Sequence, residues 1–243
     1  MKILALDSSG LVASVAVVEN DNLIAEYTMN HKKTHSQTLV PMLDEIRNMT
    51  QLDMETIDAI AVAAGPGSFT GLRIGSATAK GLGLALNKPV IAVPTVDALA
   101  YNLYGSTSVI CPLMDARRNQ VYTGLYEFVR AEGNTSYEMK RLLEQCAVDI
   151  HEIADKINEL GREVIFLGDG VDVFAETLAD IIKVSYSFAP ACCNRQRAAC
   201  VATLGQVFYE KGIIQTAAEH APDYLRLSQA ERERAEAQKN AKG

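Results

Sequence analysis

Apolar residues form short runs, separated by turns, along the first part of the chain. The runs at 2–7 and 12–18 are rich in Val, Ile and Leu, and residues 22–29 alternate apolar and polar positions. This pattern predicts three strands. The polar turn at Asp21 joins the last two of them. The chain therefore begins with an antiparallel meander whose first strand ends in Asp7.

The spacing of apolar residues changes to a helical period over residues 34–49. Pro41 falls within or near the first turns, where a missing N–H group matters least. The segment is therefore predicted to be a helix with one apolar face. The residues on that face are Leu39, Met42, Leu43, Ile46 and Met49.

A β-α-β unit follows this helix. Residues 57–64 are predicted to form a buried strand, residues 70–87 a helix and residues 88–94 a second short strand. A helix that connects two strands of one sheet makes those strands parallel. The turn between the first strand and the helix is the glycine-rich sequence GPGSFTGLRIG at 65–75.

The second half of the chain repeats this outline. Its first strand ends in Asp115, as the first strand of the chain ends in Asp7, and more strands and helices follow. The repetition favours a duplicated α/β domain. The predicted elements are a helix at 95–105, strands at 109–116 and 120–129, a helix at 149–161, a strand at 163–170, and helices at 171–182 and 196–212.

Composition narrows the function classes. The chain has 243 residues, of which 48% are hydrophobic and 22% charged, as in ordinary globular proteins. No apolar run approaches the roughly 20 residues that span a bilayer, and the first residues do not resemble a secretory signal. We expect a cytoplasmic protein. The formal net charge of −7 indicates a poor binder of nucleic acid on its own.

The five cysteines contain no C-x-x-C pair and are odd in number. This usage argues against disulfide staples and a zinc ribbon. The favoured interpretation is buried or idle thiols. Adjacent Cys192 and Cys193 are expected to point in different directions.

The glycine loop fits no phosphate motif fully. A P-loop requires a second glycine at position 70, which is Thr70, followed by Lys. The spacing of Gly65, Gly67 and Gly71 is one residue longer than in the dinucleotide-binding fingerprint. The next strand also lacks the acidic residue that would hold the ribose. Close approach of another helix is the favoured reason for so many glycines in one helix, because each costs about 1 kcal/mol there. The partner helix belongs either to this chain or to another subunit.

Other polar residues are weaker candidates. His31 and His35 are four positions apart, as in zinc sites, but no third ligand follows. Asp7, and likewise Asp97 and Asp115, lie near strand ends and are candidates for holding Mg²⁺ or orienting water, although an aspartate there also forms turns. No Ser/His/Asp or Cys/His set with a persuasive arrangement occurs.

Several segments together resemble the TsaB family, formerly YeaZ, of bacterial proteins needed to make threonylcarbamoyladenosine in tRNA. The resemblance extends to about Arg226 and is strongest over the first hundred residues. The matching segments are ILALDSS, THSQTLVPML, GPGSFTGLRIG, KPVIAVPTVDALA and PDYLR.

The resemblance implies the actin-like, Hsp70 and sugar-kinase (ASKHA) fold with two related α/β domains. It implies a non-catalytic subunit for modification of ANN-decoding tRNAs that binds the catalytic paralogue TsaD, with the ATPase TsaE joining. Thr95 and Leu99 would then replace the paralogue's two metal-binding histidines. ATP and metal are expected in the partner subunits, with no cofactor on this chain, and tRNA is reached only through the complex.

The family also implies a docking face, used in a homodimer or with the paralogue, on the first helix and the glycine-rich helix. The alternative is a stand-alone nucleotide-dependent enzyme of the same fold, or a glycoprotease-like peptidase.

We expect domains at 1–104 and 105–226, a late helix near 195–211 that returns to the first domain, and a disordered tail at 227–243. The docking residues would be His35, Leu39, Met42, Ile46, Phe69, Thr70, Gly71, Arg73, Ile74, Gly75, Ala77 and Thr78.

Overall fold

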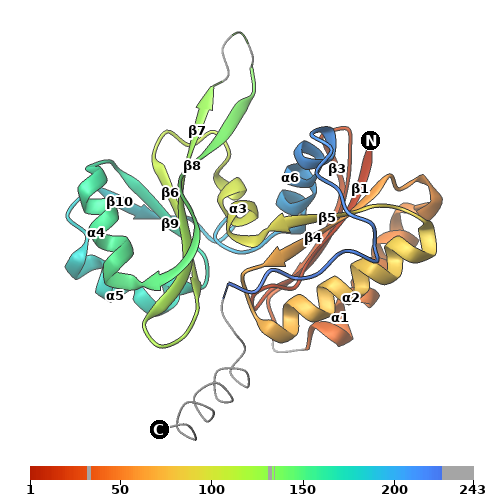
Figure 1. Cartoon of the computed structure of the whole chain (residues 1–243), viewed down its shortest axis with the longest axis horizontal. Helices are drawn as coiled ribbons and strands as arrows, with labels where there is room; N and C mark the ends of the chain where they lie inside the picture. Colours follow the sequence, from red (N-terminus) through yellow and green to blue (C-terminus); the bar gives the residue numbers. More distant parts are fainter. Residues whose placement is uncertain (32–33, 131–132, 134, 226–243) are drawn as a thin grey trace, which may run out of the picture.

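The computed structural model describes residues 1–31, 34–130, 133 and 135–225, and it contains two five-stranded sheets (Figure 1). In the first sheet the strand order is β3-β2-β1-β4-β5. β1, β2 and β3 are antiparallel neighbours, whereas β1, β4 and β5 are parallel. The predicted meander and β-α-β unit are both confirmed. The strands are β1 (Lys2–Asp7), β2 (Ala13–Glu19), β3 (Asn22–Met29), β4 (Ala59–Gly65) and β5 (Val90–Pro94).

The second sheet repeats the first. Its order is β10-β9-β6-β7-β8, with the same antiparallel and parallel pairings in the corresponding places. The chain therefore consists of two related α/β domains of the actin-like type, as expected. The strands are β6 (Val109–Asp115), β7 (Gln120–Arg130), β8 (Tyr137–Asp149), β9 (Val164–Leu167) and β10 (Tyr186–Phe188).

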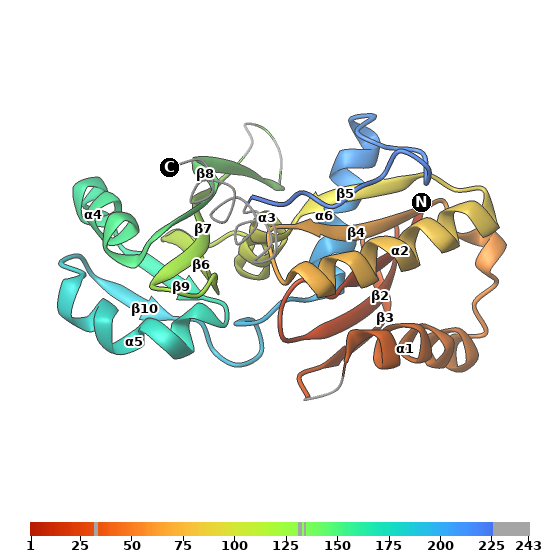
Figure 2. The same ribbon diagram turned by 60° about the horizontal axis from the view of Figure 1, so that its bottom comes forward.

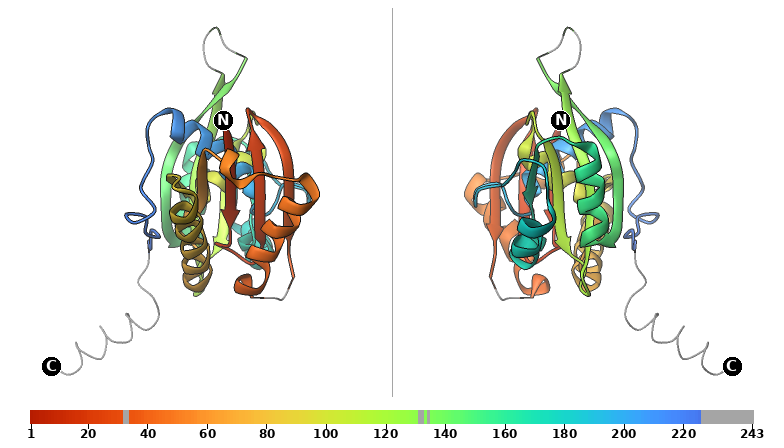
Figure 3. Two further views of the ribbon diagram at one scale, coloured as in Figure 1. Left: turned by 90° about the vertical axis from the view of Figure 1, so that its right-hand side faces the viewer. Right: turned by 90° about the vertical axis from the view of Figure 1, so that its left-hand side faces the viewer.

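Two strands of the second sheet escaped prediction. β8 is an edge strand whose side chains are largely half-exposed or exposed, and charged residues interrupt it. β10 has only three residues. Both strands are defined by backbone hydrogen bonds to a neighbouring strand, and their side chains show only a weak apolar pattern. The β7–β8 pair extends away from the body of its domain (Figure 3).

Two helices cover each face of the first sheet (Figures 1 and 2). α1 (His35–Thr50) and α2 (Phe69–Leu86) lie on one face. α3 (Thr95–Ala100) and α6 (Ala198–Glu210) lie on the other. Pro41 is the seventh residue of α1 and so lies within its first two turns, as expected. The predicted helix at 95–105 is shorter than expected and ends in a 3₁₀ turn, η2 (Tyr101–Leu103); a second such turn is η1 (Met54–Thr56).

α6 belongs to the first sheet although it follows the second domain in sequence. The N–H group of Ala198 donates to Ser14 Oγ at 2.9 Å, and Arg197 forms an ion pair with Glu26 on β3. A Cβ atom at Gly205 would lie 2.9 Å from the Ala61 Cβ on β4. Glycine at that position therefore lets the helix approach the sheet closely.

The second domain is built around two helices on one face of its sheet. α4 (Ile150–Leu160) ends at Gly161, which has a φ of 65° and suits a left-handed helix end. α5 (Gly170–Ile181) packs beside it. The opposite face joins the core of the first domain, where Tyr126 and Leu167 belong to the same buried cluster as Ile3. The two domains thus share one continuous core.

Residues 213–225, here called the C-terminal strap, run back across the first domain (Figure 2). Gln215 exchanges two backbone hydrogen bonds of 2.9 Å with Val90 on β5. Lys80 on α2 donates to the carbonyl oxygen of His220 at 2.9 Å, and the Asp223 N–H group donates to the Ala64 carbonyl oxygen at 2.7 Å. The segment predicted as a tail, 227–243, lies outside the described residues.

Candidate functional site

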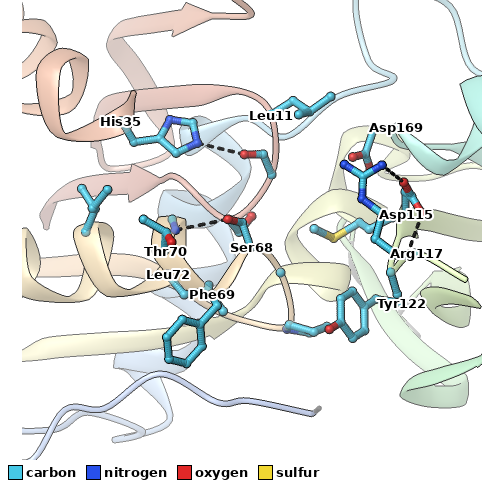
Figure 4. Close-up of a pocket in the computed structure, with 18 of the residues that line it drawn as sticks. Leu11, His35, Ser68, Phe69, Thr70, Leu72, Asp115, Arg117, Tyr122 and Asp169 are labelled. Atoms are coloured by element: carbon cyan, nitrogen blue, oxygen red, sulfur yellow. Dashed lines mark hydrogen bonds and ion pairs between the residues drawn. The ribbon is translucent and has the colours of Figure 1, made fainter. Parts of the chain in front are cut away.

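A cavity of about 680 Å³ lies between the two domains (Figure 4). The first domain contributes the β1–β2 loop at Ser9, the glycine loop and the start of α2. The second contributes Asp115 at the end of β6, Arg117 just after that strand, and Asp169 after β9. Tyr224 of the C-terminal strap completes the wall. The two strands that end in an aspartate, β1 and β6, therefore both end at this cavity.

The glycines of the loop are explained by contacts inside this chain. A Cβ atom at Gly67 would lie 2.3 Å from the Ser9 carbonyl oxygen, and one at Gly71 would lie 2.0 Å from the Ser8 carbonyl oxygen. Gly65 has a φ of 129°, and a Cβ there would lie 2.0 Å from the Asp223 carbonyl oxygen. These positions have no room for a side chain. The close partner is thus the β1–β2 loop and the strap, rather than a second helix.

Asp7 is buried beneath the cavity. Its Oδ1 accepts hydrogen bonds from the N–H group of Ser9 at 2.9 Å and from the Ser9 hydroxyl at 2.6 Å. Burial raises the pKa of Asp7 to about 6, although the Ser9 hydrogen bonds and the nearby His35 favour the charged form. A carboxyl group with this pKa is able to exchange a proton near neutral pH.

His31 and His35 both line the cavity. His35 begins α1, and its Nε2 lies 2.9 Å from the Gly10 carbonyl oxygen, while its buried Nδ1 has no partner in the described structure. Among the described residues, no group of three or more His, Cys, Asp or Glu side chains is arranged to hold a metal ion. The expectation that this chain binds no metal stays a prediction.

Three of the expected docking residues on α1 are core residues. The exposed fractions of Leu39, Met42 and Ile46 are 1%, 3% and 4%. Their side chains pack against the first sheet together with Leu4 and Val15. The apolar face that predicted the helix is therefore the face that covers its own sheet, and these three side chains do not form part of an exposed surface.

The expected docking residues on α2 divide into two groups. Gly71 and Gly75 are buried, and a Cβ at Gly75 would lie 2.6 Å from Ser8 Oγ. The others are exposed or half-exposed, and we call them the outer face of α2. Phe69 on this face stacks on Tyr224 with ring centroids 4.9 Å apart. The outer face comprises Phe69, Thr70, Arg73, Ile74, Ala77 and Thr78.

Thr95 and Leu99 lie on α3 and are buried. The Thr95 hydroxyl accepts a hydrogen bond of 3.1 Å from the Gly65 N–H group. Leu99 belongs to the shared core. The two residues are one helical turn apart, but neither carries a nitrogen that binds a transition metal. Thr95 instead fixes the start of the glycine loop.

On the second-domain side of the cavity, sequence reasoning singled out Asp115 as an aspartate at a strand end but missed Arg117 and Asp169. Asp115 accepts a hydrogen bond of 2.7 Å from the Arg117 N–H group and pairs with the Arg117 guanidinium at 3.0 Å. Burial raises the pKa of Asp169, whose Oδ1 has no partner in the described part of the chain. The available signal was the sequence Gly168-Asp169-Gly170 directly after a buried strand.

Across the residues that the structure covers, we find no helix with the length and apolar character needed to cross a membrane.

Comparisons with known proteins identify relatives over nearly the whole chain. A family model described as TsaD, tRNA N6-adenosine threonylcarbamoyltransferase, matches residues 22–234. The tRNA threonylcarbamoyladenosine biosynthesis protein TsaB of Bacillus subtilis is 35% identical over 245 residues, which cover 98% of this chain and 100% of the relative. The protein of the same name from Escherichia coli is 30% identical over 233 residues, which cover 93% and 95%.

Among solved structures, YeaZ from Pseudomonas aeruginosa is similar to this chain with a TM-score of 0.76 and 25% identity, covering 92% of this chain and 99% of the other. The match extends through both domains. From its sequence relatives and its structure alike, this chain belongs to the TsaB family of tRNA threonylcarbamoyladenosine biosynthesis proteins.

Proposed function

We propose that this chain is a non-catalytic subunit in the formation of threonylcarbamoyladenosine in ANN-decoding tRNAs. In this proposal it binds and activates a TsaD-like catalytic partner, and a TsaE-like ATPase joins the complex. Family membership supports the pathway. The formal net charge of −7 supports a chain that meets tRNA only through its partners.

The observation that carries the docking proposal is the outer face of α2. Ala77 is exposed there between the half-exposed Ile74 and Thr78, and Gly81, whose Cβ position is open space, continues the same helix side. Leu84, one turn after Gly81 on this side of the helix, is 66% exposed. Small and apolar residues on an open helix face allow another helix to approach closely. A TsaD-like subunit or a second copy of this chain would use this face.

The lack of catalysis has its own support. Thr95 and Leu99 occupy α3 with side chains that are not metal ligands, and both are buried. The ATP and metal of the reaction would belong to the partner subunits.

The test is an Ala77→Arg variant. Ala77 is exposed, so the longer charged side chain leaves the monomer folded and blocks close helix approach. We expect association with the TsaD-like partner, measured by analytical ultracentrifugation, to weaken at least ~10-fold, about 1.4 kcal/mol. A tRNA modification assay that contains the partner and the TsaE-like ATPase should lose activity in parallel. Gly75 is unsuitable for this test because its Cβ position meets Ser8.

Ala179→Arg is the matched control, since Ala179 is an exposed alanine on α5 of the other domain. It should associate normally. Unchanged association of Ala77→Arg would reject the docking face. ATP hydrolysis or tRNA modification by this chain alone would instead favour the second candidate, a nucleotide-dependent enzyme, for which the buried Asp7 beneath the cavity is the supporting observation.

A further inference from the structure

The connection between β10 and α6 carries two adjacent thiols in contact. The Sγ atoms of Cys192 and Cys193 lie 3.9 Å apart. Their segment is a turn in which the Cys193 N–H group donates to the Pro190 carbonyl oxygen at 3.0 Å. The expectation that the two side chains point in different directions is therefore wrong. The turn brings both sulfur atoms to one side of the chain.

The two thiols differ in accessibility. Cys192 is exposed, whereas Cys193 is partly buried and its Sγ faces the Pro190 carbonyl oxygen at 3.7 Å. An exposed thiol beside a shielded one gives an order of events, because an oxidant in solution reaches Cys192 first. Cys193 then lies within contact distance of whatever forms on Cys192.

The neighbouring thiol, Cys200, is already engaged. It donates to Asn102 Oδ1 at 2.9 Å, and burial raises its pKa to about 12. Burial raises the pKa of Cys193 as well, but Cys193 already lies in contact with Cys192, whereas the Cys200 side chain is held on Asn102. The geometry thus favours reaction within the adjacent pair over a bond from either member to Cys200.

This turn follows β10 of the second domain and is tied by hydrogen bonds to the first domain. Asn102, which follows α3, donates through Nδ2 to the carbonyl oxygens of Cys193 at 3.0 Å and Arg195 at 2.6 Å. Gln196, directly before α6, packs its buried amide against Gly10 of the β1–β2 loop, at the edge of the cavity. A chemical change at the two thiols therefore acts on a segment that joins the domains.

We propose that Cys192 and Cys193 form a modification site at which a low-molecular-weight disulfide, such as glutathione disulfide, generates a bond between the two sulfur atoms. The Cys192 thiolate attacks one sulfur of the oxidant, forming a mixed disulfide and releasing one glutathione thiolate. The Cys193 thiolate then attacks Cys192 Sγ and expels the second glutathione. The protein loses two electrons and two protons, and the oxidant is reduced to two thiols.

Bond formation changes the turn. The sulfur atoms must approach from 3.9 Å to about 2.0 Å. This movement draws the two side chains together and alters the position of the Cys193 carbonyl group that Asn102 holds. A thiol reductant should restore the starting state by the reverse exchange.

The experiment treats the full chain with glutathione disulfide and follows thiol content and intact mass. We expect two of the five thiols to disappear and the mass to fall by about 2 Da, with recovery after dithiothreitol. Cleavage by trypsin yields a peptide of residues 184–195 that holds both cysteines without Cys200. The mass decrease should map to this peptide.

Three variants make the result decisive. Cys193→Ser should stop at the mixed disulfide and keep one glutathione, because the resolving thiol is absent. Cys192→Ser should react slowly or not at all, and Cys146→Ser on β8 should behave like the parent chain. A stable glutathione adduct on the parent chain, a bond to Cys200 or between chains, or five intact thiols under conditions that oxidise free dithiothreitol would each overturn the proposal.

Discussion

Asp7 carries the unusual chemistry of the site at the scale of a single residue. It lies at the end of β1, shielded from water, and its carboxylate accepts two hydrogen bonds from Ser9. Burial disfavours the carboxylate more than these bonds favour it, so the pKa rises to about 6. The residue thus combines a position beneath the cavity with a proton that exchanges near neutral pH.

This pKa has a consequence for stability. Between about pH 4 and about pH 6 the folded chain keeps a proton on Asp7 that the unfolded chain releases, so the free energy of unfolding falls as pH rises through this window. Asp7→Asn removes the titration. We expect the stability of Asp7→Asn relative to the parent chain to increase by up to ~3 kcal/mol across the window and to stay level above it.

Urea denaturation of both proteins at matched pH values measures this difference. Parallel stability curves from about pH 4 to about pH 7 would show that Asp7 does not titrate in this range.

At the scale of one element, the glycines of α2 have unequal roles. Gly71 leaves no space for a Cβ, which would lie 2.0 Å from the Ser8 carbonyl oxygen. At Gly81 nothing lies within 4 Å of the same position. The β1–β2 loop therefore rests on the first turns of α2, while the position of Gly81 in the far half of the helix is free of such a constraint.

The pair Gly71→Ala and Gly81→Ala tests this difference within one helix. Gly71→Ala should destabilise the chain by about 2–4 kcal/mol, because the backbone of the loop must move. Gly81→Ala should stabilise it by up to ~1 kcal/mol, since alanine is the better helix former. Chemical denaturation of the two variants gives the comparison, and similar losses in both would contradict the proposed contact.

Element by element, periodicity predicts most of this fold but not what each apolar face meets. The spacing of Leu39, Met42 and Ile46 correctly predicts α1, yet the same spacing suits a helix that packs on its own sheet or on a partner. Burial shows the first arrangement. β8 was missed for a related reason, because an edge strand with few buried residues is defined by its pairing with β7 rather than by its own pattern.

The whole molecule is held together where α3 meets the second sheet. Asp97 on α3 is 1% exposed and accepts a hydrogen bond of 2.8 Å from the Tyr126 hydroxyl on β7. Arg141 on β8 donates to the same carboxylate through Nε at 3.0 Å and through a second nitrogen at 2.5 Å. These contacts fix two neighbouring strands of the second domain to a helix that also packs on the first sheet.

Removal of the positive partner should therefore weaken the whole chain. Arg141→Met leaves the Asp97 carboxylate buried without its counter-charge, and we expect a loss of about 2–4 kcal/mol in the free energy of unfolding. Adding Asp97→Asn to this variant removes the unpaired charge and should recover part of the loss. Equilibrium denaturation of the single and double variants decides the question. A double variant less stable than Arg141→Met would argue against a buried ion pair.

The duplicated architecture was predictable at this scale, but the cavity was not. Two strands that end in Asp7 and Asp115 indicate two related halves, and the strand orders confirm it. The cavity brings together Ser9, Asp169 and Tyr224, which are distant in sequence. No local sequence pattern predicts how the two domains pack against each other, because their relative position depends on the shared core.

The C-terminal strap has a practical consequence for work with this protein. Through Gln215 it pairs with the outer edge of β5, and its Ala217 sits over Gly83 in the core. A truncation that removes residues 213–225 would leave β5 as a bare edge, and bare edges recruit other strands and promote aggregation. Shortened versions should therefore keep Leu225.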